Sequence, residues 1–397
     1  MLPVDLPDTV RDALLAPLVD HHCHGVRRDD LTRAQFELLI TEGGSPAPPG
    51  TTHFDTPLGV ALRRWCAPLL DLEPHAPPAV YLARRAELGA GEVNRRLLTG
   101  AGVVAFLVDD DGPGDGPGDG PGDDVSGIDD VDLLSAAEMG RHGGAAADEL
   151  VRIERIERDV AESAQAALDY LDSLGEALAA RAARAVGLKT VIAGVCGLDL
   201  EPGRPSRGSV LAAANRRLAE PKEPATEPVL LRHLLWSAID VARERGLPLQ
   251  FHTGFAGSAP DLHRCDPARM SAFVRALQPL GVPVILLHCY PFHRQAAYLA
   301  AVYPHVYVDI GLALPHTAAA SARVMEELLE LTPFHKQLFS SHCRGVAETA
   351  YLGALYYRQA LGAALRARLG AGEWSVADAA RIAHMIGSGN ARRVYRL

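Results

Sequence analysis

Short apolar runs rich in β-branched residues alternate along this chain with longer segments of helical character that are rich in alanine and arginine. This alternation is typical of a parallel sheet whose strands are joined by crossover helices. Eight runs are expected to form strands, at 17–24, 102–108, 149–154, 186–193, 247–252, 282–288, 305–310 and 336–342. Eight β/α units favour a closed (β/α)8 barrel of the TIM type over an open sheet, so residues 1–397 are expected to form one α/β domain.

Two stretches depart from this alternation. The segment 26–96, rich in proline and arginine, follows the first strand and is expected to form a helical insertion, or lid, over the barrel mouth. The segment 109–124 repeats Gly-Pro-Gly-Asp and is expected to be a flexible loop, because such a composition cannot bury a core. Helices are expected at 157–185, 229–245, 267–280, 294–302, 345–369 and 375–397.

Composition narrows the range of partners. A formal net charge of -10 argues against nucleic acid, since phosphate neutralisation needs a basic face. The first 20 residues lack the pattern of a signal peptide, and no apolar stretch reaches the roughly 20 residues of a membrane span, so we expect a cytoplasmic protein with no membrane partner. The six cysteines show no CxxC pair and are interpreted as reduced thiols. A homo-oligomer is compatible with the sequence.

Histidines stand at the ends of several expected strands. His22 and His24 lie two residues apart in Asp-His-His-Cys-His, so the alternation of a strand directs both to one side. His252, His288 and His342 end three later strands. In barrel enzymes these C-terminal strand ends carry the chemistry, and a divalent ion explains why several neutral donors would meet there. The five imidazoles are predicted to bind one or two metal ions.

Three other residues have suitable positions. Lys189 lies in an apolar strand, where an ammonium must be neutralised, paired or carbamylated, and a carbamate could bridge two metals. Glu154 is the alternative carboxylate ligand, or else forms a salt bridge with a neighbouring arginine. Asp309 ends the seventh expected strand, where it either orients a ligating histidine or caps a helix. Weaker candidates, suggested only by adjacency, are His21, His293 and Arg344.

Taken together, these residues resemble the amidohydrolase superfamily, which has an HxH motif on strand one, lysine on strand four and histidines on strands five and six. The segments 251–255, 286–311 and 338–348 resemble its amidohydrolase-2 branch, which includes a domain fused to glutamine synthetase. The resemblance implies a metal-dependent barrel enzyme. One departure stands out: where the family has aspartate on strand eight, this chain has His342.

That departure removes the carboxylate that takes a proton from metal-bound water in the hydrolases. A histidine-rich site suits redox-active iron at least as well as zinc. With this departure the chain also resembles a non-heme di-iron oxygenase offshoot of the superfamily. The resemblance implies, as the leading interpretation, a monooxygenase of antibiotic biosynthesis that uses O2 and a bulky apolar substrate. Two irons are the expected cofactor, with zinc or manganese as alternatives, and His342 and Asp309 are the candidate catalytic residues.

Two other interpretations stay open. One is a metal-dependent hydrolase or deaminase of C–N bonds, with His342 or His288 as the base. The other is a catalytically silent barrel that binds a partner resembling glutamine synthetase, although a silent scaffold gains nothing from clustered imidazoles.

Overall fold

The computed structural model describes residues 5–109, 133–255, 257 and 261–397. Within these residues the strands form one parallel sheet in the order β1-β2-β3-β4-β5-β6-β7. Their bounds are β1 Leu18–His24, β2 Val103–Asp109, β3 Ala146–Arg152, β4 Gly187–Thr190, β5 Leu249–Thr253, β6 Val284–His288 and β7 Val306–Val308. Neighbours in sequence are neighbours in space, which is the order that successive β/α units of a barrel produce.

The segment 337–345 occupies the place of an eighth strand between β7 and β1. Leu338 N donates a hydrogen bond to Val308 O at 3.0 Å, and His342 N donates one to His22 O at 3.1 Å. The segment contacts both edges of the sheet, although its backbone is too irregular to form a regular strand. The predicted TIM-like barrel is confirmed, and the eighth predicted strand is present as this irregular connection.

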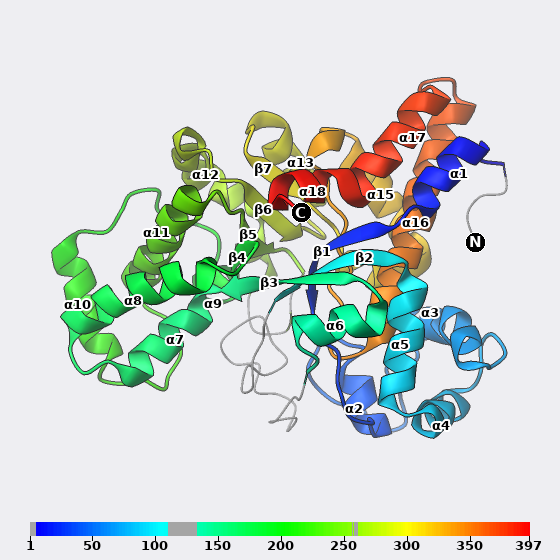
Figure 1. Ribbon diagram of the computed structural model, residues 1–397, viewed down its shortest axis with the longest axis horizontal. Helices are drawn as coiled ribbons and strands as arrows, with labels where there is room; N and C mark the ends of the chain where they lie inside the picture. The colour runs from blue at the N-terminus through cyan, green and yellow to red at the C-terminus, as the bar shows by residue number, and fades with distance from the viewer. Residues whose placement is uncertain (1–4, 110–132, 256, 258–260) are drawn as a thin grey trace.

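Helices cover the outside of the sheet (Figure 1). The helices that follow the strands or precede them are α1 Asp8–Leu15, α5 Ala90–Ala101, α6 Ala136–Gly143, α7 Ile153–Ser163, α8 Ala167–Ala182, α9 Ile192–Cys196, α10 Arg207–Arg217, α11 Pro228–Arg245, α12 Ser271–Leu277, α13 His293–Val302, α14 Ala313–Thr317, α15 Ser321–Leu329, α16 Ala347–Gly370, α17 Val376–His384 and α18 Asn390–Tyr395. The single helix predicted at 157–185 is wrong, because the chain breaks into α7 and α8 near residue 165.

The third strand also differs from the prediction. It ends at Arg152, and Glu154 lies in the first turn of α7 instead of at the strand end. An acidic residue in the first helical turn interacts favourably with the positive end of the helix dipole, which favours this boundary.

The inner face of the sheet is filled by side chains, so the barrel is not a pore. Leu107 of β2 and Leu287 of β6 belong to a buried cluster that includes Val394 and Tyr395 of the C-terminal helix α18. Helix α18 therefore packs against inward-facing strand residues, and Tyr395 reaches the polar groups described below.

Between β1 and β2 the chain forms α2 Arg33–Leu38, α3 Pro57–Trp65 and α4 Pro78–Leu88, drawn in blue in Figure 1. Helix α4 is anchored to α16 by a buried ion pair, in which Arg85 Nε donates to Glu348 Oε1 at 2.6 Å. The Tyr81 hydroxyl donates to the same carboxylate oxygen at 2.8 Å. Whether the segment 26–96 acts as a lid stays a prediction.

The predicted flexible loop at 109–124 begins one residue too early. Asp109 is the last residue of β2 and is buried, whereas residues 110–124 lie outside the described residues.

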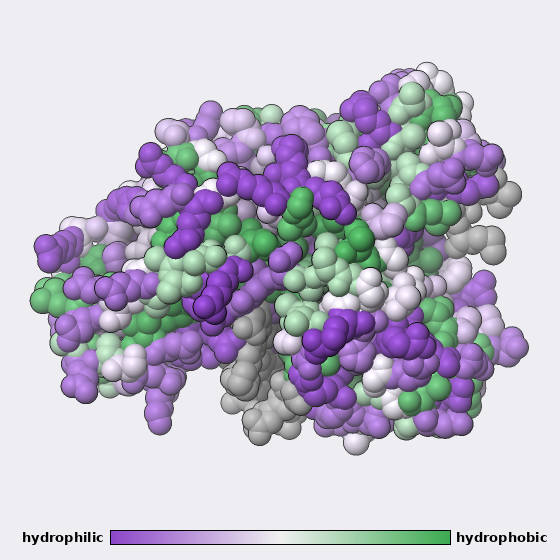
Figure 2. All heavy atoms as spheres, in the orientation of Figure 1, coloured by the Kyte–Doolittle hydropathy of each residue, from purple (hydrophilic) through white to green (hydrophobic). Residues whose placement is uncertain are grey.

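The face seen in Figure 2 is mostly hydrophilic, with hydrophobic side chains in smaller groups between the polar ones. Within the described residues, no helix combines the length and the apolar character needed to cross a membrane.

Candidate metal centre

A β-bulge in β1 prepares the site. Asp20 pairs with Phe106 and Cys23 pairs with Val108, so two residues of β1, His21 and His22, stand opposite a single residue of β2. A bulge re-aims the side chains beside it. His21 contacts Asp309 and Tyr395, whereas the ring of His22 lies with the other strand-end histidines.

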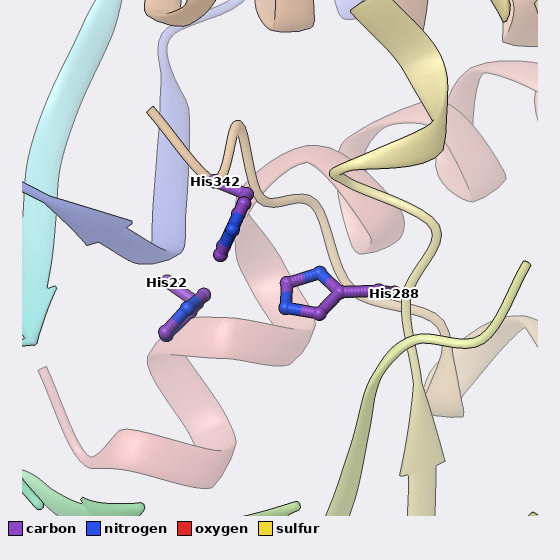
Figure 3. A group of neighbouring side chains, drawn as sticks. All are labelled: His22, His288 and His342. Carbon is purple, nitrogen blue, oxygen red and sulfur yellow. The ribbon is translucent and has the colours of Figure 1, made fainter. Parts of the chain in front are cut away.

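The five predicted imidazoles come together. The ring centroids of His22 and His24 are 5.1 Å apart, those of His22 and His342 are 5.3 Å apart, and those of His288 and His342 are 4.2 Å apart. His252 adjoins the group, with its ring 4.7 Å from that of His288. Figure 3 shows the rings of His22, His288 and His342 pointing toward one another from three separate segments. All five side chains are buried.

Four of the five imidazoles lie in groups of described residues that could hold a divalent cation. His252 is in neither group, and its Nε2 lies 3.1 Å from the backbone oxygen of Phe255. Ligand atoms of His22, His288 and His342 all lie within 4.8 Å of one another, and so do those of His22, His24 and Asp109. Neither ring nitrogen of His22 has a hydrogen-bond partner among the described residues, although both are buried. Burial, followed by the nearby charge of Lys189, lowers the pKa of His22 well below its ordinary value, so the ring is neutral and able to ligate.

Because a neutral imidazole has one unprotonated ring nitrogen, His22 can ligate in only one of the two groups. A first cation at His22, His288 and His342 would leave His24 and Asp109 for a second one.

Two of the candidate ligands have strained backbones. His288 has φ 68° and His342 has φ 49°, in the left-handed region that residues with a side chain rarely adopt. Such strain costs about 1–3 kcal/mol at each residue and persists only where the surroundings enforce it. At His288 the enforcing group is Asp309, whose Oδ1 accepts a hydrogen bond from His288 N at 2.6 Å.

Asp309 is the centre of a buried polar network. Its Oδ2 is 2.7 Å from His21 Nε2 and accepts a hydrogen bond from Ser340 Oγ at 2.7 Å. His21 Nδ1 is in turn 3.0 Å from the hydroxyl of Tyr395. Burial alone would raise the pKa of Asp309, but the His21 contact and the other hydrogen bonds outweigh it and lower that pKa. Asp309 is therefore an ionised acceptor, and its hydrogen bond positions the backbone of His288.

Asp109 was missed by the sequence analysis. Its Oδ2 lies 2.8 Å from Lys189 Nζ, 2.7 Å from Arg152 Nη2 and 3.8 Å from His24 Nδ1. The signal was present, because Asp109 directly follows the apolar run of the second strand, at the same strand end as the histidines. In the structure Lys189 pairs with Asp109, and its carbamylation stays a prediction.

The other candidates lie outside the imidazole cluster. Glu154 accepts hydrogen bonds from Val191 N at 3.0 Å and from the Thr190 hydroxyl, and burial raises its pKa. His293, on α13, is 2.7 Å from a carboxylate oxygen of Glu327. In the structure, neither Glu154 nor His293 joins a possible metal-binding group.

Arg344 is placed differently from these two, because it lines a small pocket beside His342. The pocket lies between residues 38–42 of the insertion and residues 312–316 after β7. It is the side from which a small molecule could approach His342.

A family model described as amidohydrolase matches residues 107–397, which is most of the chain. The chain belongs to the amidohydrolase family. It is a metal-dependent enzyme of the amidohydrolase type, and the cluster of histidines with Asp109 is its candidate metal centre.

Individual proteins are similar to this chain in sequence or in fold. Protein fluG of Emericella nidulans is 29% identical over 223 residues, which are 53% of this amidohydrolase and 26% of fluG, so the chain matches about a quarter of that protein. A putative metal-dependent hydrolase from Lactobacillus casei has the same fold, with a TM-score of 0.82 over 98% of each chain and 22% identity. The uronate isomerase of Thermotoga maritima is more distant, with a TM-score of 0.63 over 98% of each chain and 11% identity.

Proposed function

We propose that this amidohydrolase-type enzyme is a non-heme di-iron monooxygenase. It would hydroxylate a bulky apolar substrate, an acyl thioester or a diterpenoid-like molecule, in the biosynthesis of an antibiotic or a related natural product. The observation that carries the proposal is that the two carboxylates near the imidazoles, Asp109 and Asp309, are already engaged by other residues.

Hydrolysis at such a centre needs a group able to accept a proton from water, and in the family that group is a carboxylate. Asp109 is engaged by Lys189 and Arg152. Asp309 accepts hydrogen bonds from two backbone N–H groups and the Ser340 hydroxyl, besides its contact with His21. Both carboxylates are therefore engaged by donors of other residues, and His342 stands where the family has its base. This arrangement supports redox chemistry over ordinary hydrolysis.

The histidines supply the ligands for this chemistry. His22, His288 and His342 would hold one iron, and His24 with Asp109 would contribute to the other. Iron, when bound, supplies the electrons that activate O2. Hydroxylation of a C–H bond consumes one O2, two protons and two electrons and yields the alcohol and water, so the enzyme also needs a two-electron reductant, such as a reduced flavin or iron–sulfur protein.

The chain's own residues bind and orient the substrate. The pocket beside His342 has a mixed lining, in which Leu38, Leu39, Leu312 and Pro315 stand beside the polar Thr41, Glu42, His316, Arg344 and Thr349. The insertion contributes Leu38, Leu39, Thr41 and Glu42 to this lining, which supports a role for 26–96 in covering the substrate.

The test begins with protein purified without oxygen and loaded with Fe2+. We expect about two irons per chain, a spectroscopic signature of coupled iron, and O2 consumption that depends on a reductant. With 18O2 and a thioester of a bulky acid, one labelled oxygen should enter the product. Protein that binds zinc alone and consumes no oxygen would overturn the proposal.

A second candidate is a metal-dependent hydrolase or deaminase, favoured by the family assignment and by the hydrolase description of the Lactobacillus casei protein. The variant His342→Asp separates the two. It should impair an oxygenase, because it replaces a neutral ligand, and it should raise the activity of a hydrolase, because it restores the base.

A further inference from the structure

We propose that Asp109 is the charged ligand of the metal centre and that it relocates to β2 the negative charge that the family places on strand eight. The inference rests on the metal dependence within the proposed function and not on the reaction that the metal serves.

The geometry singles out this carboxylate. Asp109 offers an oxygen within 4.8 Å of ligand atoms of both His22 and His24, and its side chain is fully buried. Among residues 5–109, 133–255, 257 and 261–397, it is the only acidic residue that lies with these imidazoles in a possible metal-binding group.

Charge gives the second argument. Imidazoles bring no negative charge to a divalent ion, and taking an uncompensated ion out of water is costly. His342 stands in place of the family's aspartate, so its lost charge must be supplied elsewhere. Asp109 brings one carboxylate beside His24, with Oδ2 3.8 Å from Nδ1 of that ring, and shares it with Lys189 and Arg152.

The contacts of Asp109 are compatible with ligation. A carboxylate has two oxygens with about four acceptor positions, so hydrogen bonds from Lys189 and Arg152 leave capacity for a metal. The two cations also keep the carboxylate ionised and fix its orientation. Lys189 thereby acts as a positioning residue for Asp109.

The competing explanation is that Asp109 only neutralises Lys189 and Arg152. Both explanations predict that Asp109→Asn harms the protein, so a rescue separates them. If the centre needs one carboxylate, His342→Asp should restore metal binding to Asp109→Asn. If Asp109 only balances the buried cations, a carboxylate on the opposite side of β1 should restore nothing.

The experiment titrates metal-free protein with Co2+ and follows its visible absorption, with metal analysis as a second readout. Asp109→Asn should bind Co2+ more weakly by at least the roughly 10- to 100-fold that the loss of a hydrogen-bond partner of a ligand causes. The double variant with His342→Asp should return to within about threefold of the native affinity. Asp29→Asn is the matched control, because Asp29 pairs with Arg27 at 2.6 Å but is half exposed and lies outside the possible metal-binding groups.

Where Asp109→Asn does not fold, the variant Asp109→Asn with Lys189→Met is used in its place. It removes one charge of each sign, so the net charge of Asp109, Lys189 and Arg152 together is unchanged. Native Co2+ affinity in a folded variant without Asp109 would overturn the inference. So would a folded Asp109→Asn protein whose Co2+ binding is not restored by adding His342→Asp. Because no step uses O2, an enzyme that consumes no oxygen would end the monooxygenase proposal without touching this one.

Discussion

Replacement of Asp309 by asparagine should lower the free energy of unfolding much less than replacement by alanine. Asparagine can still bond to the four buried groups that contact Asp309, whereas alanine cannot. In the native protein the carboxylate accepts from His288 N, Gly311 N and Ser340 Oγ and pairs with His21 Nε2. Alanine leaves all four without an acceptor. At about 1–3 kcal/mol for each unsatisfied buried donor, the loss is about 4–12 kcal/mol, close to the whole stability of a typical domain.

Asparagine keeps one oxygen for the two backbone N–H groups. Its amide nitrogen can donate to His21 Nε2 when that ring carries its proton on Nδ1, which then donates to Tyr395, 3.0 Å away. The amide's second hydrogen can meet Ser340 Oγ. What is lost is mainly the charge, so we expect Asp309→Asn to cost about 1–3 kcal/mol.

The assay is urea unfolding of the metal-free proteins at pH 7, followed by circular dichroism. We choose pH 7 because the pKa of Asp309 is lowered on folding. The stabilisation from its charge is therefore complete above the unfolded pKa of about 3.9, and it is lost as the pH falls through the folded pKa. Equal unfolding free energies for the two variants, or a folded Asp309→Ala within 1 kcal/mol of native, would refute the reasoning.

Three further outcomes are expected. Tyr395→Phe removes the hydroxyl beside His21 while keeping the ring, and should cost about 1–3 kcal/mol in urea unfolding; no loss would show that His21 finds another partner. Arg85→Met strands the buried carboxylate of Glu348 and should cost about 3–5 kcal/mol, whereas a second change, Glu348→Leu, should recover most of it. Burial raises the pKa of Cys196 to about 11, so its alkylation by iodoacetamide should be slow at pH 8 and rise about tenfold per pH unit toward 11; a pH-independent rate would contradict this.

Most of the barrel could be predicted because each strand carries its own signal. The apolar runs and the histidines that end them are local features, and parallel strands bring those ends to one rim. His22, His24, His252, His288 and His342 were found in this way, and they lie together in the structure.

What could not be predicted depends on contacts between distant segments. The bulge that turns His21 toward Asp309 exists only when β1 is paired with β2. Glu154 was placed one element too early, because its helix starts directly after Arg152 without a break in the sequence. Asp109 was assigned to a loop because it begins a run of aspartates, and its role emerges only beside Lys189.

The relocation of charge connects these findings to the chemistry. A carboxylate on strand eight serves the hydrolases twice, as a ligand and as a base. On β2 the same charge is held by Lys189 and Arg152, so it can balance a cation but is poorly placed to accept a proton from water. A centre that keeps a carboxylate near the metal but lacks the strand-eight base can still bind the metal, although it loses the base that hydrolysis uses. The Asp109→Asn variant with His342→Asp should therefore regain metal binding without regaining oxygenase activity, and a variant that recovered both would show that the position of the charge does not matter.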